Sequence, residues 1–163
     1  MVLISGRSLR GLVAAACLTL PPVLAPTPAA AQSSIGFTGG ASIDPEQVYA
    51  GVFWQSDDIA GRFRLRPGID GGFGDGLRLG TINLDFTYLF PLGSQWSLLT
   101  GGGPVVVLTR LADDRFDQGT DLTAGLSWLF GFHHENGFLV DVRLGGGRTP
   151  ALKAGVGWAL KFR

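Results

Sequence analysis

Residues 81–90 read TINLDFTYLF, a stretch in which polar and apolar side chains alternate from Thr81 to Tyr88. The apolar set is Ile82, Leu84, Phe86, Tyr88 and Phe90, and the polar set is Thr81, Asn83, Asp85 and Thr87. Because successive side chains of an extended strand point to opposite faces, this period of two predicts a β-strand with one apolar and one polar face.

The same alternation recurs along the chain, at 122–133, 138–144 and 152–162. Seven segments with turn residues separate the patterned stretches: 44–46, 56–58, 74–75, 91–93, 112–118, 134–137 and 146–150. They predict eight strands, at about 35–43, 47–55, 61–73, 76–90, 95–110, 120–133, 138–146 and 150–162. The pattern is weakest at 47–55 and 95–110, where both faces are mainly apolar or glycine. We therefore expect an all-β, antiparallel up-and-down protein.

One register follows from turn chemistry. If Gly74-Asp75 is a two-residue hairpin loop, Phe73 pairs with Gly76. This register places three polar pairs opposite one another: Arg62 with Thr87, Arg64 with Asp85, and Arg66 with Asn83. A slip by one residue would place Arg64 opposite Leu84, so turn and pattern agree.

The first 31 residues differ from the rest and predict a cleaved signal peptide. Arg7 and Arg10 precede an uncharged apolar stretch at 11–20, and Ala29 and Ala31 occupy the small positions of a cleavage site. We expect cleavage after Ala31, which leaves one domain at 32–163. Cys17, the only cysteine, lies in the leader, and Ala14 stands where a lipoprotein signal would favour leucine, although lipid anchoring stays an alternative.

The composition of residues 32–163 excludes several classes of protein. Eleven basic residues against thirteen acidic ones do not suggest a nucleic-acid binder. Without cysteine the domain has neither disulfides nor thiolate metal sites. It has no uncharged run of helix-spanning length, so it can cross a membrane only as a closed barrel, which satisfies every backbone group.

Alternation alone does not tell a soluble barrel, with its apolar face inward, from a membrane barrel, with that face outward. The polar face carries charged and small residues rather than the dense Lys and Glu of a solvated surface, which favours an interior of ion pairs. We predict a lumen charge network made of Arg62, Arg64, Arg66, Asn83, Asp85, Asp141, Arg143 and Lys153. It would act as a plug of paired charges or, alternatively, as a selectivity constriction.

The aromatic residues also favour a membrane. With the strands numbered from a periplasmic N-terminus, all four tryptophans fall near the periplasmic ends. Tryptophan and tyrosine prefer the bilayer interface because the ring is apolar at one end and polar at the other. The predicted interfacial girdle is Trp54, Tyr88, Trp96, Trp128 and Trp158.

On these grounds residues 35–163 resemble the small outer-membrane β-barrel families of Gram-negative-type bacteria, of the outer-membrane protein W, protein X and OmpA-transmembrane-domain type. The most specific element is the final alternating strand, 156–162, with Trp158, Leu160 and Phe162. The resemblance implies that this strand is an assembly signal for the barrel-assembly machinery. Two features depart from these families: Arg163 follows the terminal aromatic, and the outer loops at 44–46 and 74–75 are short.

No residue cluster predicts catalysis. His133 and His134 would point to opposite faces of a strand and have no third metal ligand nearby. The residues two positions after them are Glu135 and Asn136, so neither histidine is part of the His-x-Ser motif of lipid A deacylase barrels. The glycines at 101–103 lack the Lys and Ser or Thr of a phosphate loop, and with Pro104 they predict a strand kink or a lateral gap.

We therefore expect no cofactor, no metal and no enzymatic activity. The predicted function is a structural or envelope role for a monomer in outer-membrane lipid, with at most a narrow pore for small solutes. A soluble periplasmic barrel that binds a hydrophobic ligand and a lipid A-modifying barrel enzyme are the alternatives.

Overall fold

The computed structural model describes residues 32–74, 76–111 and 120–162. It contains eight strands: β1 (Ser33–Ile43), β2 (Gln47–Gln55), β3 (Phe63–Gly74), β4 (Leu77–Leu92), β5 (Trp96–Leu111), β6 (Asp121–His134), β7 (Phe138–Gly147) and β8 (Leu152–Phe162). The eight predicted strands are confirmed. The predicted signal peptide at 1–31 and the central part of the long connection after residue 111 lie outside the described residues. The described residues include no helix with the length and hydropathy needed to cross a bilayer.

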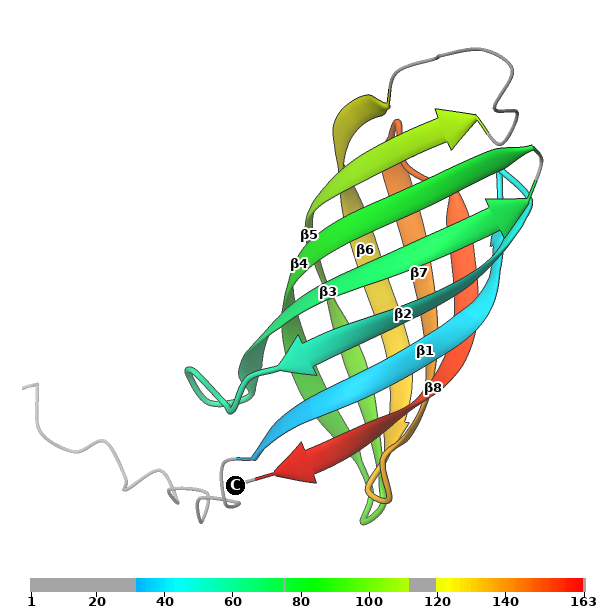
Figure 1. Ribbon diagram of the computed structural model, residues 1–163. Helices are drawn as coiled ribbons and strands as arrows, with labels where there is room; N and C mark the ends of the chain where they lie inside the picture. Colours follow the sequence, from blue (N-terminus) through cyan, green and yellow to red (C-terminus); the bar gives the residue numbers. More distant parts are fainter. Residues whose placement is uncertain (1–31, 75, 112–119, 163) are drawn as a thin grey trace, which may run out of the picture. The chain divides into compact units, whose positions relative to one another are not determined.

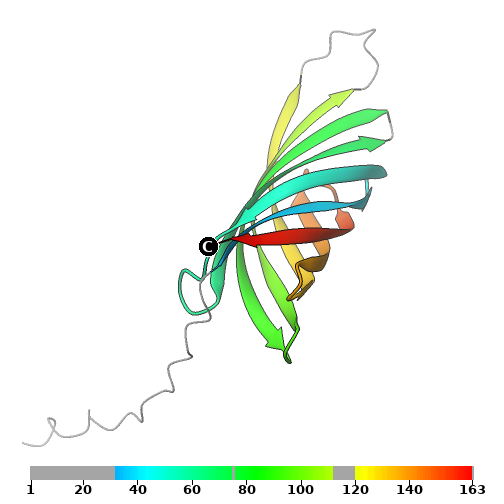
Figure 2. The same cartoon turned by 60° about the horizontal axis from the view of Figure 1, so that its bottom comes forward.

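The eight strands form one closed antiparallel barrel, in which each strand pairs with the next one and β8 pairs with β1 (Figure 1). The closing ladder runs from Ser33 opposite Phe162 to Ile43 opposite Leu152. The beginning of β1 and the end of β8 therefore lie at the same end of the barrel, as Figure 2 also shows. Closure leaves no unpaired sheet edge. The predicted fold class is confirmed.

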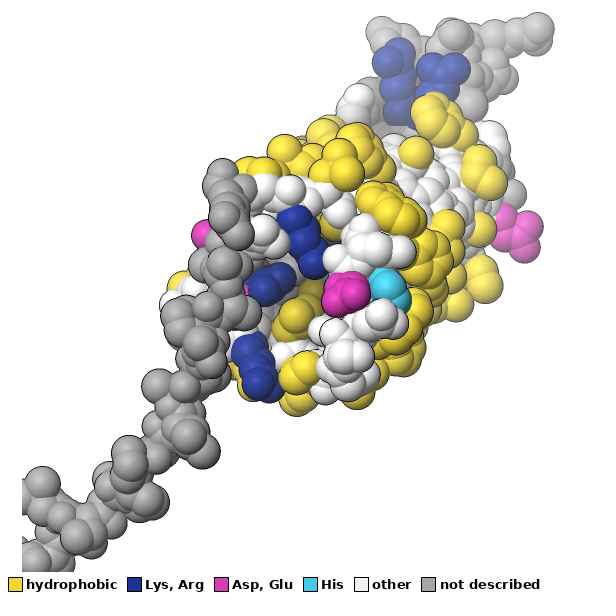
Figure 3. All heavy atoms as spheres, turned by 90° about the horizontal axis from the view of Figure 1, so that it is seen from below, with side chains coloured by type: hydrophobic (Ala, Val, Ile, Leu, Met, Phe, Trp, Pro, Cys, Tyr) yellow, Lys and Arg dark blue, Asp and Glu magenta, His cyan; other side chains and the backbone are white. Residues whose placement is uncertain are grey.

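The apolar face of the barrel points outward. Among the described residues, 27 large hydrophobic side chains are exposed and only seven are buried. On β4, Ile82 and Phe86 are 52% and 59% exposed, whereas Asp85 between them is 1% exposed. Seen from one end, hydrophobic side chains surround the barrel and charged side chains gather around its opening (Figure 3). A soluble barrel with an apolar interior is therefore excluded.

The β3–β4 register differs from the predicted one by two residues. Gly74 pairs with Leu77, so the loop consists of residues 75 and 76, one position later than expected. Gly76 has a φ of 65°, the left-handed conformation that makes Asp-Gly a favoured hairpin sequence. The actual pairs are Arg64 with Thr87, Arg66 with Asp85, and Gly68 with Asn83. A shift of two residues keeps every side chain on its predicted face, because strand alternation has the same period.

The glycines before Pro104 allow close approach of β5 to its neighbours and do not open a gap. A Cβ atom at Gly101 would overlap the carbonyl oxygen of Phe86, and one at Gly103 would overlap that of Leu84. The β5–β6 ladder continues through Gly103 and Pro104. The β4–β5 ladder lacks the pairs of Leu84 with Pro104 and of Asp85 with Gly103, but its register is the same on both sides of this interruption. The lateral gap considered from the sequence is absent from this part of the described chain.

This packing predicts that Gly103→Ala prevents efficient barrel assembly, because its methyl group would displace the β4 backbone. The matched control is Gly71→Ala, since a Cβ at Gly71 meets no atom within 4 Å. Overpacking of this kind costs about 1–3 kcal/mol or more. The fraction of protein that migrates in the folded position on unheated gels measures the effect. Equal folded fractions for the two variants would contradict the steric explanation.

Candidate functional site: the charged lumen

The inward side chains in the middle of the barrel form three ion-paired groups. The first joins β8 to β3, where the Nζ atom of Lys153 donates to Asp70. Asp70 also accepts hydrogen bonds from Thr81 at 2.6 Å and from Asn83 at 3.1 Å, both on β4. One carboxylate thus receives donors from two strands, which satisfies its buried charge.

The second group joins β7 to β4. The guanidinium of Arg143 forms two parallel hydrogen bonds with the carboxylate of Asp85, at 2.8 and 2.7 Å. Its Nη1 atom also donates to Ser127 of β6 at 2.8 Å. This two-point geometry fixes both side chains across the lumen, because the planar guanidinium matches the planar carboxylate.

The third group joins β3 to β7. Arg66 Nη2 donates to Asp141 Oδ2 at 2.5 Å, and the other oxygen of Asp141 lies 3.2 Å from His133 Nε2 on β6. The guanidinium of Arg66 also lies over the ring of Phe53, 3.7 Å from its centroid. Arg66 is 2% exposed, so this charge is held by one carboxylate and one aromatic face.

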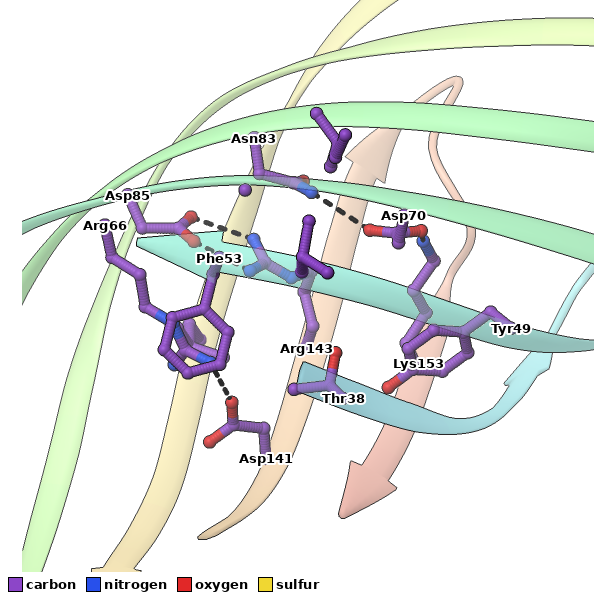
Figure 4. A pocket seen from close by; sticks show the side chains of 14 residues that line it. Thr38, Tyr49, Phe53, Arg66, Asp70, Asn83, Asp85, Asp141, Arg143 and Lys153 are labelled. Carbon is purple, nitrogen blue, oxygen red and sulfur yellow. Dashed lines mark hydrogen bonds and ion pairs between the residues drawn. The ribbon is translucent and has the colours of Figure 1, made fainter. Parts of the chain in front are cut away.

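Together these groups balance three basic side chains with three acidic ones inside the barrel (Figure 4). The cavity between them has a volume of about 40 Å³. A water molecule needs roughly 10–15 Å³ by this measure, so the space fits no more than a few waters. Arg66 and Asn83 line the cavity, and both carry buried polar atoms without a protein partner: Nε and Nη1 of Arg66 and Oδ1 of Asn83. The middle of the lumen is therefore nearly filled, with polar groups facing the little space that is left. A larger cavity of about 220 Å³ lies toward the end where β1 begins and β8 ends, and Ser34, Gln55, Arg64 and His133 are among its lining residues.

Two of the predicted network residues lie elsewhere. Arg62 precedes β3, is exposed and has a φ of 127°, so it is not part of the lumen cluster. Arg64 is inward but near the barrel end, where its Nε atom donates to Asp58 at 2.5 Å rather than to Asp85. The other six, which are Arg66, Asn83, Asp85, Asp141, Arg143 and Lys153, line the same cavity.

Sequence analysis missed Asp70, which is central to the first group. The residue has the same parity in β3 as Arg64 and Arg66, so the period of two could have identified it. The sequence does not reveal this, because glycines lie close to Asp70 on both sides and the other face of the strand has no regular series of apolar residues. The sequence predicts a strand that ends at His133 and a turn that begins at His134, whereas β6 continues through His134.

The predicted girdle residues lie on the outer wall. At the barrel end where β1 begins and β8 ends, aromatic rings contact one another: Trp96 with Phe138, Phe138 with Trp158, and Phe63 with Tyr88. Trp54 is near the end of β2 and 38% exposed. Trp128 lies apart from them, in the middle of β6 and opposite Gly102 and Leu144.

The two histidines point to opposite faces. His133 faces Asp141 in the lumen, whereas His134 packs edge-on against Trp96 outside. Within the described part of the chain, no group of three or more His, Cys, Asp or Glu residues has the arrangement of a metal site.

No family model matches the chain, and no curated protein matches it in sequence. Among solved structures, Neisserial surface protein A superimposes with a TM-score of 0.58 at 13% identity, over 80% of this chain and 95% of the other. The attachment invasion locus protein Ail of Yersinia pestis gives a TM-score of 0.47 at 13% identity, over 81% and 97%. Ail in a phospholipid bilayer nanodisc gives 0.48 at 11% identity, over 80% and 99%. The likeness to the Neisserial protein shows that this chain has the fold of a small eight-stranded outer-membrane barrel, which confirms the resemblance predicted from the sequence.

The Asp85–Arg143 pair gives a test of what the lumen charges contribute. We expect Asp85→Leu alone to destabilise the barrel by about 3–5 kcal/mol, because the buried guanidinium loses its carboxylate. The double variant Asp85→Leu/Arg143→Met should recover most of that loss, since it removes both charges. Urea unfolding in lipid vesicles, followed by tryptophan fluorescence, measures both.

The matched control is Asp58→Ala, which breaks the more exposed Arg64–Asp58 pair. It should cost no more than about 1 kcal/mol. Equal losses in the free energy of unfolding for Asp85→Leu and Asp58→Ala would show that the lumen pair contributes no more to stability than the exposed pair.

Proposed function

We propose that this protein is a non-enzymatic outer-membrane β-barrel with a structural role in the bacterial envelope, and that its lumen is plugged by paired charges. The observation that carries the proposal is the inverted pattern of the barrel, with an apolar outer wall and an ion-paired interior.

The outer wall suits a bilayer. The eight strands have 9 to 16 residues, and a tilted strand needs about 9–11 to cross the hydrocarbon core. The closed ladder supplies a partner strand to every strand, as the bilayer interior requires. The aromatic contacts at the end with both termini support an interfacial ring at the periplasmic side.

A plug is favoured over a selectivity ring because each charge has a partner of opposite sign. A pore that selects ions needs unpaired charge facing an open path. Here the three pairs cross the lumen between different strands, and the space among them is about 40 Å³. An eight-stranded barrel has an interior just wide enough for side chains, and the paired charges nearly fill the middle of this one.

Export supports the same proposal. The leader at 1–31 has the composition of a signal peptide, and the final strand has outward Trp158, Leu160 and Phe162. In our proposal the leader is removed after Ala31, and the barrel-assembly machinery recognises this strand before insertion as a monomer. Neisserial surface protein A, which shares the fold, is by name a surface protein, in keeping with a place in the envelope.

The location predicts that the mature protein begins at Gln32 and needs detergent for extraction from the outer-membrane fraction. Mass spectrometry of the purified protein gives the first residue, and gels with and without heating show the barrel. Recovery of a detergent-free, monomeric protein from the periplasm would refute membrane insertion.

The plug predicts little steady conductance in planar bilayers for the native protein. Removal of one complete pair, with Asp70→Ser/Lys153→Ser, should widen the lumen and produce discrete conductance steps, because neither charge stays behind unpaired. Asp58→Ser/Arg64→Ser, which removes a pair at the barrel end, is the control and should stay closed. Native conductance equal to that of the Asp70/Lys153 variant would refute the plug.

A further inference from the structure

Within the described residues, the outer wall carries a cross-strand pair of like charges. Arg78 of β4 and Arg110 of β5 are direct cross-strand partners. Both are exposed, and both occupy the outward positions that Ile82 and Val106 hold further along the same strands. Directly opposite side chains on one face of a sheet have Cβ atoms about 5 Å apart, so the two guanidinium groups share one small area of the wall.

Two like charges in direct opposition destabilise a strand pair unless an anion lies between them. Within the described residues, no acidic side chain forms an ion pair with either arginine. Guanidinium groups bind phosphate through parallel hydrogen bonds, and two of them together form a site for a phosphate monoester or diester.

The pair lies at the barrel end away from the termini. It sits where β4 begins and β5 ends, whereas the aromatic contacts lie at the other ends of these strands. If the start of β1 faces the periplasm, as proposed above, Arg78 and Arg110 lie at the barrel end that faces the outer leaflet. The charge of the wall thus complements phosphate at one membrane surface only.

A row of small outward residues leads from this pair to a hollow over β1 to β3. Gly80, the next outward residue after Arg78, pairs with Gly71, which pairs with Ala50, which pairs with Gly39. This row of four small residues crosses β4, β3, β2 and β1. Over β1 to β3 it borders a surface hollow of about 540 Å³, with Phe37, Val52 and Ile69 along one side. Because the strands are tilted against the barrel axis, the row runs obliquely along the wall (Figure 1).

The backbone does not require these glycines. Gly39, Gly71 and Gly80 are not among the glycines with positive φ. A Cβ at Gly71 meets nothing within 4 Å, and one at Gly80 or Gly39 makes only ordinary contacts. Gly101 and Gly103, by contrast, are required by neighbouring backbone. The small residues of the row therefore shape the outer surface rather than the sheet.

We propose that this wall holds one phosphate-bearing lipid of the outer leaflet, with its phosphate between Arg78 and Arg110 and an acyl chain in the groove from Gly80 to Gly39. The proposal rests on the membrane location proposed above. It adds a specific lipid site to a barrel that would otherwise contact lipid only as solvent.

Lipid retention tests the headgroup contact. The mature barrel is purified in detergent, incubated with bisphosphorylated lipid A, and analysed by native mass spectrometry for bound lipid. Arg78→Ala/Arg110→Ala should reduce retention by about tenfold, since two charge-assisted contacts are lost. Arg62→Ala/Arg148→Ala removes the same charge from exposed positions outside the pair and should bind like the native protein. Equal binding by the two double variants would overturn the proposal.

The probe itself is then varied. Dephosphorylated lipid A should bind the native barrel as weakly as the Arg78/Arg110 variant binds the phosphorylated form, and inorganic phosphate alone should not compete at millimolar concentration. Full competition by inorganic phosphate would show a free-anion site instead.

The sequence places Asp113, Asp114 and Asp117 soon after Arg110. If lipid binds only after these three residues are replaced by Asn, their carboxylates and not a lipid phosphate are the partners of the two arginines. That result would refute the lipid proposal.

The groove has its own variant. Gly71→Leu places a large side chain in the hollow. Because a Cβ at this position meets no atom within 4 Å, the barrel should fold normally. It should retain lipid several-fold less well than Gly71→Ala. Folding is scored separately by heat-dependent gel migration. If Gly71→Leu folds, inserts and binds lipid as well as Gly71→Ala does, the groove is refuted but the membrane location is not. If the native protein fails to insert, the location itself is refuted.

Discussion

Closure of the sheet by the β1–β8 ladder is the constraint on which the rest of the structure depends. Eleven residue pairs between Ser33–Ile43 and Leu152–Phe162 turn an open sheet with two edges into a ring. An eight-stranded ring encloses only enough space for side chains. The interior must then satisfy its own polar groups, while the outer wall, with 27 large exposed hydrophobic side chains, needs an apolar surrounding. Charged core and apolar surface are two consequences of one closed ladder.

The small interior also explains why the charges are paired across the lumen rather than along a strand. Arg66, Arg143 and Lys153 each reach a carboxylate on a strand that is not their neighbour in the ring. Such cross-lumen pairs connect opposite walls in a way that backbone hydrogen bonds cannot. Because breaking one pair leaves a charge in a space with little water, the pairs specify the packing of the interior more strongly than they favour folding itself.

The features that depend only on parity could be predicted from sequence. Alternation in 81–90, 138–144 and 152–162 identified strands, faces and fold class, and it placed Asp85 and Arg143 on the same side of the wall. Pairing across the lumen could not be predicted in this way, because it depends on register and on barrel geometry. The hairpin at 75–76 shows the limit: an error of one position in the loop changed the partner of Asp85 from Arg64 to Arg66 but left every face correct. Asp70 was not predicted because a glycine-rich strand hides the parity of its residues.

The outer wall shows that lipid-facing surfaces also carry information. If the bilayer acted only as a solvent, any large apolar residue would serve at each outward position, and Gly71 and Gly80 would be disfavoured there. The backbone around Gly71 leaves space for a side chain, whereas that around Gly103 does not, so the two glycines have different causes although the sequence presents them alike. A hollow beside a pair of unopposed arginines is therefore a departure from uniform hydrophobicity in both shape and charge. Because both departures lie on neighbouring strands at the same end of the barrel, one bound lipid explains them together, and separate explanations for each would need two coincidences.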